Sequence, residues 1–235
     1  MKNLVKKISV LSLSLLITLA LTNCEAVKNA NNKQKGAAIG AAGGAIIGAI
    51  IGNNVGKGGN GEIGAVIGGV VGGTAGVLIG NKMDKQAQKI EQEVPGATVE
   101  RVDNGIVVTF DENSGVYFDT NKDNINTKSE ETLDKLAKVF VEFPDTNILV
   151  VGHTDNTGKE GYNMTLSKNR AYSVTNYLKG KGLANNRFTT HWFGETQPKY
   201  DNTTASGRAK NRRVNVAIVP NEKMKEEAKK EAGEN

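Results

Sequence analysis

The sequence contains few of the residue types that carry redox and metal chemistry. It has one cysteine and two histidines in 235 residues. One cysteine excludes an intramolecular disulfide framework, and the set is too small for a structural zinc site of the usual cysteine–histidine kind. Although there are 28 glycines, no segment ends in the Gly-Lys-Ser/Thr of a phosphate-binding loop. We therefore expect no cofactor.

Excess charge of one sign is also scarce. The formal net charge is +5, and Lys2, Lys6 and Lys7 contribute three of these charges ahead of an apolar run. If that run is a removable export signal, the remaining chain carries about +2. Such a balanced charge gives no argument for binding nucleic acid.

Residues 1–23 have the pattern of a secretory signal. The basic start is followed by an apolar stretch from Ile8 to Leu21, which is too short for a comfortable membrane span. The stretch ends in Leu21-Thr22-Asn23-Cys24, which resembles the lipobox of bacterial lipoproteins, although Asn23 replaces the usual glycine or alanine. This resemblance implies cleavage before Cys24 and a lipid anchor on it. It also favours the outer membrane, because the cysteine is followed by Glu25 and not by the aspartate that keeps some lipoproteins in the inner membrane. The alternative is a buried or incidental cysteine.

Glycine recurs every four residues in the next segment, which holds 17 of the 28 glycines. The two ladders are Gly36, Gly40, Gly44, Gly48, Gly52, Gly56 and Gly64, Gly68, Gly72, Gly76, Gly80. On a helix this period forms a stripe that lets a second helix approach closely. A polar stretch, Lys57–Glu62, separates the ladders, so we expect a helical hairpin over residues 36–81. The alternative is a flexible linker, but Ala, Ile and Val between the glycines are unusual for one.

Beyond Gly96, strand and helix periodicities alternate. Residues 99–102 and 106–110 predict a hairpin around Asn104-Gly105, and residues 148–151, 187–193 and 213–219 predict further strands. The capping-box spacing of Thr127 and Glu130 predicts a helix that ends before Pro144, and a second helix is expected over 163–178. This order indicates an α/β sandwich with a mixed sheet and helices on one face. The charged tail has few apolar residues, and we expect it to be solvated or frayed.

A family resemblance becomes specific in this region. The run Val151-Gly152-His153-Thr154-Asp155-Asn156-Thr157-Gly158 is followed by Asn163, Leu166-Ser167 and Arg170-Ala171, and later by Asn211-Arg212-Arg213-Val214. Together these elements resemble the OmpA C-terminal, peptidoglycan-associated domain. The expected segments are a signal (1–23), a polar tether (24–35), the hairpin (36–81), a connector (82–104), the OmpA-like domain (105–219) and a charged tail (220–235).

The resemblance implies binding of peptidoglycan stem peptides at the free end of diaminopimelate, without enzymatic activity. That end carries an ammonium and a carboxylate on one carbon. The matching residues here are Asp155 for the ammonium and Arg170 for the carboxylate, whose planar fork can donate two parallel bonds. The alternative is a salt bridge between the two that only fastens loop to helix. The other site residues that we expect are Phe118, Asp119, Thr154, Asn163, Leu166 and Arg212.

Some of these residues also have a simpler interpretation. Phe118 and Leu166 are equally compatible with the core, Asn163 with a helix cap, and Arg212 with a solvated helix face. For the whole chain we expect a noncovalent tether between the outer membrane, reached through an acylated Cys24, and the wall. The alternative is a pore-forming or membrane-perturbing lipoprotein whose glycine helices form a homo-oligomer, while the wall domain only localises it.

Overall fold

The computed structural model describes residues 71–102, 104–110, 116, 118 and 121–234. The predicted signal, Cys24, the polar tether, the first glycine ladder and the turn between the ladders lie outside the described residues, as does Asp119. The predictions made for those residues therefore stay predictions.

Five strands form one mixed sheet in the order β1-β2-β5-β3-β4. All neighbours are antiparallel except β3 and β4, which are parallel. The strands are β1 (Thr98–Val102), β2 (Gly105–Phe110), β3 (Thr146–Gly152), β4 (Phe188–Trp192) and β5 (Val214–Pro220). The five strands and the hairpin at Asn104-Gly105 are those that the sequence predicts.

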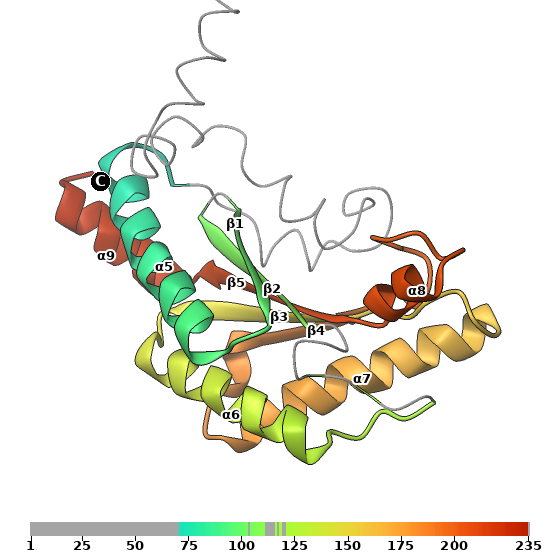
Figure 1. Ribbon diagram of the computed structural model, residues 1–235. Coiled ribbons are helices and arrows are strands. Elements are labelled where there is room, and N and C mark those ends of the chain that lie inside the picture. Colours follow the sequence, from blue (N-terminus) through green and yellow to red (C-terminus); the bar gives the residue numbers. More distant parts are fainter. Residues whose placement is uncertain (1–70, 103, 111–115, 117, 119–120, 235) are drawn as a thin grey trace, which may run out of the picture.

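Two long helices cover the sheet on one side, α6 (Thr127–Glu142) and α7 (Glu160–Gly180). Figure 1 shows them lying next to each other below the strands. The α6 helix ends before Pro144 as expected, but its N-cap is Asn126, one residue earlier than the capping-box spacing indicates; its side chain accepts a hydrogen bond of 2.9 Å from Ser129 N. The α7 helix begins three residues before the predicted start. Two short helices, η1 (Asn185–Arg187) and α8 (Ala205–Asn211), complete the connections.

The core lies between the sheet and these helices. Along β2, Ile106, Val108 and Phe110 point into it and are fully buried, whereas Val107 belongs to a separate cluster on the opposite face. Of the described residues, only strand residues and Phe193 make up that second cluster. The α/β sandwich with helices on one face is therefore confirmed.

One helix crosses the predicted boundary between hairpin and connector at residue 81. Residues on both sides of it form one helix, α5 (Gly73–Glu93), which packs against α6 and β1. Its buried residues include Ala75, Ile79, Met83 and Ala87, which are spaced by four, so the apolar stripe continues from the second ladder across residue 81. The end of the ladder thus belongs to the folded domain, because its Ala and Ile side chains supply part of the core.

The charged tail also differs from expectation. It forms α9 (Glu222–Ala232), which lies beside α5 (Figure 1). Met224 and Ala228, one turn apart, are buried, and these two side chains suffice because α5 offers an apolar partner. Glu234 Oε1 then accepts hydrogen bonds from Thr74 N (2.7 Å) and Ala75 N (3.3 Å), which satisfies donors at the start of α5.

Candidate functional site

The sequence motif Val151–Gly158 begins in the last two residues of β3 and continues into the loop that follows. The strand pairing continues past Gly152, because His153 N donates to Arg213 O (3.0 Å) and Thr154 N donates to Gly194 O (2.9 Å). These bonds hold the backbone immediately before Asp155 between two neighbouring segments. Asp155 is therefore carried by backbone that is fixed on both sides.

The α7 helix approaches β3 unusually closely at this end. A Cβ on Gly152 would overlap the carbonyl oxygen of Ser167, so only glycine allows this spacing. The Ser167 hydroxyl accepts a hydrogen bond from Gly194 N (2.9 Å), and Gly194 has a φ of 55°. This contact sets the position of Arg170, which lies one turn further along α7, relative to the strand end.

Asp155 is a buried, ionised carboxylate that accepts hydrogen bonds from two donors. Its side chain is 9% exposed, its Oδ1 accepts from Thr157 N and its Oδ2 from Arg212 Nη1, both at 2.8 Å. Burial raises the pKa of Asp155, but the hydrogen bonds from Arg212 and Thr157 outweigh burial and hold the pKa below its ordinary value. Each carboxylate oxygen has two lone pairs, so each can accept a further hydrogen bond.

Arg170 is the buried cation of the site. The residue is 3% exposed, its Nε donates to Lys122 O (3.0 Å), and its guanidinium lies 5.1 Å from the centre of the Phe118 ring. Burial, followed by repulsion from Arg212, lowers the pKa of Arg170 to about 10, against attraction from Asp155 and other groups. Arg170 therefore remains charged at neutral pH.

Asn163 fastens the loop after Asp155 to α7. Its Nδ2 donates to Asp155 O (3.3 Å), Thr157 O (3.1 Å) and Glu195 Oε2. The residue is buried and lies in the first turn of α7, so it is not the N-cap, which is Lys159. Asn163 acts here as a brace for the loop.

The remaining predicted residues divide into three groups. Thr154 is buried beside Asp155, and Phe118 is half-buried, packed on the core and stacked on Arg170. Leu166 is half-buried and belongs to neither core cluster. Asp119 lies outside the described residues. The structure thus brings Asp155, Arg170, Phe118 and Asn163 together at one end of the sheet.

The alternative of a salt bridge between Asp155 and Arg170 does not describe the ion pair found here. Among ion pairs between described residues, Asp155 takes part in one, and its partner is Arg212 at 2.8 Å. Arg212 follows α8, 57 residues further along the chain. The resemblance placed Arg212 in the site, but nothing in its local pattern indicated contact with Asp155. The local pattern likewise gave no signal for the carbonyl group of Lys122.

His153 next to the site has the environment of a structural residue. It is 1% exposed, and its ring stacks on Phe193 with 5.7 Å between the centres. Burial, followed by repulsion from Arg213, lowers its pKa well below the ordinary value. The neutral imidazole therefore fills space under the loop. The described residues include no cluster of three or more His, Cys, Asp or Glu side chains suited to a metal ion.

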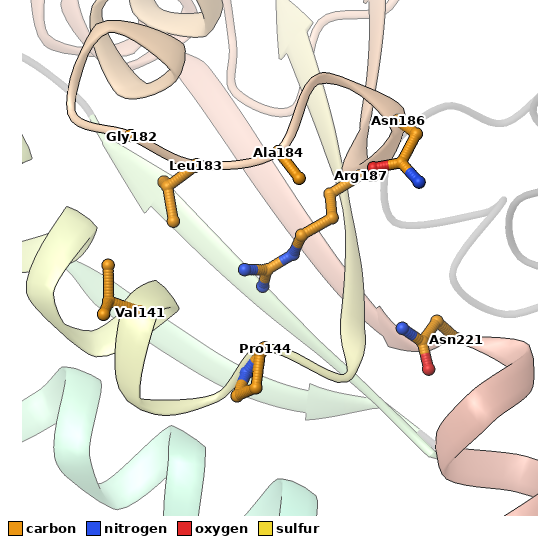
Figure 2. A pocket seen from close by; sticks show the side chains of 8 residues that line it. All are labelled: Val141, Pro144, Gly182, Leu183, Ala184, Asn186, Arg187 and Asn221. Carbon is orange, nitrogen blue, oxygen red and sulfur yellow. The ribbon is translucent and has the colours of Figure 1, made fainter.

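A cavity of about 380 Å³ lies at the opposite end of the sheet, where β3 and β4 begin. In Figure 2 the Arg187 side chain reaches into the space between Leu183 and Pro144. Its guanidinium is occupied by main-chain acceptors, since it donates to Phe140 O, Phe143 O and Thr146 O at 2.8–2.9 Å. These bonds satisfy two carbonyl groups at the end of α6 and one at the start of β3, so Arg187 has a structural role. No helix among the described residues is both long and apolar enough to cross a membrane.

Comparison with known proteins covers both halves of the chain. A model of the OmpA family matches residues 117–212, and a model of the YMGG-like Gly-zipper matches residues 1–84. The probable lipoprotein YiaD of Escherichia coli K12 is 34% identical over 142 residues, which cover 60% of this chain and 65% of the relative. The outer-membrane lipoprotein YfiB of Pseudomonas aeruginosa is 39% identical over 113 residues, which cover 48% of this chain and 67% of the relative.

Two further comparisons concern the wall. The peptidoglycan-binding protein ArfA of Mycobacterium tuberculosis is 41% identical over 88 residues, which cover 37% of this chain and 27% of the relative. The solved structure of the cell wall anchor of the T6SS from Pseudomonas aeruginosa superposes with a TM-score of 0.51 at 25% identity and covers 59% of this chain and 96% of that one. The aligned part thus spans less than two thirds of the E. coli and M. tuberculosis relatives. From these matches, the chain belongs to the OmpA family and carries a YMGG-like glycine-zipper segment at its N-terminal end.

Proposed function

We propose that this protein tethers the outer membrane to peptidoglycan noncovalently, by recognising the diaminopimelate-containing stem peptide. The observation that carries this proposal is the pair of buried opposite charges at one end of the sheet. Asp155 and Arg170 are 6% and 3% exposed, and both are held by main-chain hydrogen bonds. The peptidoglycan-binding relative and the wall-anchor structure support a role at the wall.

The pair matches the two charges at the end of diaminopimelate. The ammonium group would donate to the Asp155 carboxylate, each of whose oxygens has one lone pair left after the bonds from Thr157 and Arg212. The carboxylate would accept from the Arg170 guanidinium, and the Phe118 ring beside that guanidinium limits its orientation. Both charges of the ligand are thereby compensated in a partly buried site.

In the site without ligand, Arg212 is the cation that pairs with Asp155. It pairs with Asp155 at 2.8 Å, and its side chain is 36% exposed, so its charge is accessible from the solvent side of the site. A ligand carboxylate held by Arg170 would also be attracted by Arg212, whose positive charge acts on Arg170. We therefore assign Arg212 to the site as a partner of the ligand.

The membrane end of the tether is the lipid on Cys24, which lies outside the described residues. The relatives named as lipoproteins support this assignment, and more than one acyl chain would make the attachment stable. The mass of the protein extracted from membranes tests it, with an acylated N-terminal Cys24 expected. An unmodified Cys24 would contradict the anchor.

The pore-forming alternative gains no support from the described part of the glycine ladder. Gly76 and Gly80 lie in α5, whose buried face packs on the wall domain. A helix committed to that packing does not offer the same face to an oligomer in the bilayer. We therefore do not propose a pore.

A pull-down with purified sacculi tests the proposed function. The full-length protein in detergent should sediment with sacculi, and Asp155→Ala should remain in solution. Asp134→Ala is the matched control, because this acid also pairs with a cation, Lys181 at 2.6 Å, but its side chain is 43% exposed and lies on α6. Equal sedimentation of all three proteins would show that wall binding, if present, does not use Asp155.

A further inference from the structure

The sheet face that points away from α6 and α7 carries an apolar cluster of its own. Its members are between 0% and 8% exposed: Val102, Val107, Leu149, Val151, Phe193, Ala217 and Val219. Among the described residues, the helices contribute no side chain to this cluster, whereas α5, α6, α7 and α9 all contribute to the core on the other face. An apolar sheet face is stable only when a second layer covers it. We call this surface the second face.

The loop after β4 covers one part of the second face. Gln197 O accepts a hydrogen bond of 3.2 Å from Arg213 Nη2, and Lys199 Nζ lies 3.7 Å from Glu100 Oε2. Glu100 lies on the second face, because Val99 beside it in β1 packs on the core. Of the described loop residues after β4, only Phe193 belongs to the apolar cluster, so the aliphatic part of the face needs another partner.

Arg213 is a buried cation on the second face. The residue is 3% exposed, and its Nε and Nη1 have no hydrogen-bond partner among the described residues. It lies near His153, whose ring stacks on Phe193 of the cluster. Burial lowers the pKa of Arg213 to about 10, against attraction from Tyr200, so the side chain stays charged at neutral pH. A buried cation with unsatisfied donors is costly, so the partner of this face should bring a negative charge.

The chain enters the described domain at the edge of the second face. Val71 O lies 3.5 Å from Asn104 Nδ2 in the β1–β2 turn, and Val102, just before this turn, belongs to the apolar cluster. Gly72 is extended and Gly73 has a φ of 68°, so the chain changes direction immediately before α5. The segment that precedes Val71 therefore starts next to the second face.

The sequence of this segment matches what the face lacks. Residues 62–70 read Glu-Ile-Gly-Ala-Val-Ile-Gly-Gly-Val, and Glu62 is the one acid between Glu25 and Asp84. From Val219, at the end of β5, to Arg213 the strand covers about 20 Å. The nine residues from Glu62 to Val71 can span up to about 30 Å. An acid and an apolar run are thus within reach of the cation and the apolar cluster.

We propose that residues 62–70 dock on the second face, with their apolar side chains on the cluster and the Glu62 carboxylate at Arg213. The carboxylate accepts hydrogen bonds from the Arg213 donors and compensates its charge. This docking is independent of the ligand at Asp155. It fastens the second glycine ladder to the wall domain on both sides of Gly72, so residues 25–61 alone connect the domain with Cys24.

Cysteine crosslinking of the full-length protein in detergent tests the docking. Ala217→Cys, on β5 in the middle of the face, would be combined in turn with Val66→Cys and with Ile67→Cys. A disulfide requires the two Cβ atoms to come within about 4 Å. We expect at least one of the two pairs to join in most of the protein, as peptide mapping of the joined cysteines, Cys24 included, would show.

The matched control replaces Ala217→Cys by Val141→Cys. Val141 is 61% exposed and lies on α6, in the helix layer across the sheet, so it should join to neither position. If neither pair with Ala217→Cys forms a disulfide within one chain, the segment does not dock there. Disulfides between Ala217→Cys of two copies would also contradict the proposal, because a second copy would then cover the face.

Thermal unfolding of the full-length protein tests the ion pair. Glu62→Gln should lower the melting temperature by at least about 4 °C, because Arg213 loses its counter-charge. Glu226→Gln, at an exposed position on α9, should change it by less than about 2 °C. In an Arg213→Gln background, Glu62→Gln should have no further effect. Equal effects of Glu62→Gln in both backgrounds, or of Glu62→Gln and Glu226→Gln in the wild-type background, would show that Glu62 does not meet Arg213. The second comparison decides if Arg213→Gln fails to fold.

Discussion

Asp155 and Arg170 hold opposite charges at positions that are more than nine-tenths buried. An ionised group in such a place costs several kcal/mol unless hydrogen bonds and a counter-charge compensate it. Arg212 and Thr157 N compensate Asp155, and the carbonyl group of Lys122 accepts from Arg170. The free site is therefore preorganised with both charges present, which suits a ligand that carries one charge of each sign.

The first prediction at this scale concerns Gly152. In Gly152→Ala the new methyl group would overlap the Ser167 carbonyl group, so α7 must move away from β3. We expect the free energy of unfolding to fall by about 1–3 kcal/mol. Gly161→Ala on the same helix has open space around its Cβ and should be neutral or up to about 1 kcal/mol more stable. Urea denaturation compares them, and equal stability of the two variants would contradict the close packing.

The second prediction concerns His153 and pH. Its folded-state pKa lies well below the ordinary 6.5, so the unfolded chain binds a proton that the folded protein excludes. Above about pH 6.5, His153 is mostly neutral in both states, and its protonation does not lower the free energy of unfolding. As the pH falls from about 6.5 towards the lowered pKa, the free energy of unfolding decreases by at most about 1.4 kcal/mol per pH unit. His153→Phe, which keeps a ring against Phe193, should flatten the change in unfolding free energy between pH 7 and pH 5. An unchanged slope in the variant would rule out His153 as the cause.

At the scale of elements, α5 and α9 extend the wall domain beyond the span that the sequence indicated. The α5 helix supplies Ile79, Met83 and Ile90, each fully buried, and α9 covers it from outside. The last glycines of the ladder therefore belong to the folded domain that carries the site. A domain boundary at Gly96 would remove these side chains from the core.

Truncation tests this boundary. A chain that starts at Gly96 should lose at least about 4 kcal/mol of unfolding free energy relative to one that starts at Val71, because three buried apolar side chains disappear from the core. Thermal unfolding followed by circular dichroism would measure the difference. Equal melting temperatures would mean that α5 is only appended to the domain.

The elements that could be predicted are those whose sequence pattern lies within the element itself. Short runs of apolar, mostly β-branched residues identified β2, β3 and β5, and the Asn104-Gly105 turn identified the first hairpin. The continuation of α5 across residue 81 was missed because the glycine period ends there while the apolar stripe does not. The helix in the charged tail was missed because its two buried apolar residues, Met224 and Ala228, hold it only through packing on α5, and the tail's own sequence does not show that contact.

In the candidate site, too, only the residues that belong to one local motif could be predicted from the sequence. Asp155, Arg170 and Asn163 come from one continuous motif, and the structure brings them together. The bond between Asp155 and Arg212 joins residues 57 positions apart, and it depends on where α8 ends. That position follows from packing at Gly207, whose Cβ would overlap the Asp201 carbonyl group, and the sequence pattern contains no signal of this contact.

At the scale of the whole molecule, the two ends of the sheet have different roles. The charged pair lies where β3 and β4 end, whereas the cavity at Arg187 lies where they begin, and Arg187 makes structural hydrogen bonds there. The α5 and α9 helices lie side by side (Figure 1), and α5 begins two residues after Val71, the first described residue. A ligand fixed at the strand ends and an anchor on the N-terminal segment would together make the domain a link between wall and membrane.

The central claim is that the pair reads the two charges of diaminopimelate. Titration of the folded protein with a muropeptide containing diaminopimelate, and with its lysine-containing counterpart, tests it most directly. The lysine stem lacks the second carboxylate and should bind weakly. Asp155→Ala and Arg170→Ala should each lose about 30-fold to several thousandfold in affinity for the diaminopimelate ligand, because one ligand charge is left uncompensated. Arg170→Lys should not restore full binding, since an ammonium group cannot donate two parallel bonds to a carboxylate. If both alanine variants fold, as circular dichroism would show, and bind this ligand like wild type, the pair does not recognise diaminopimelate.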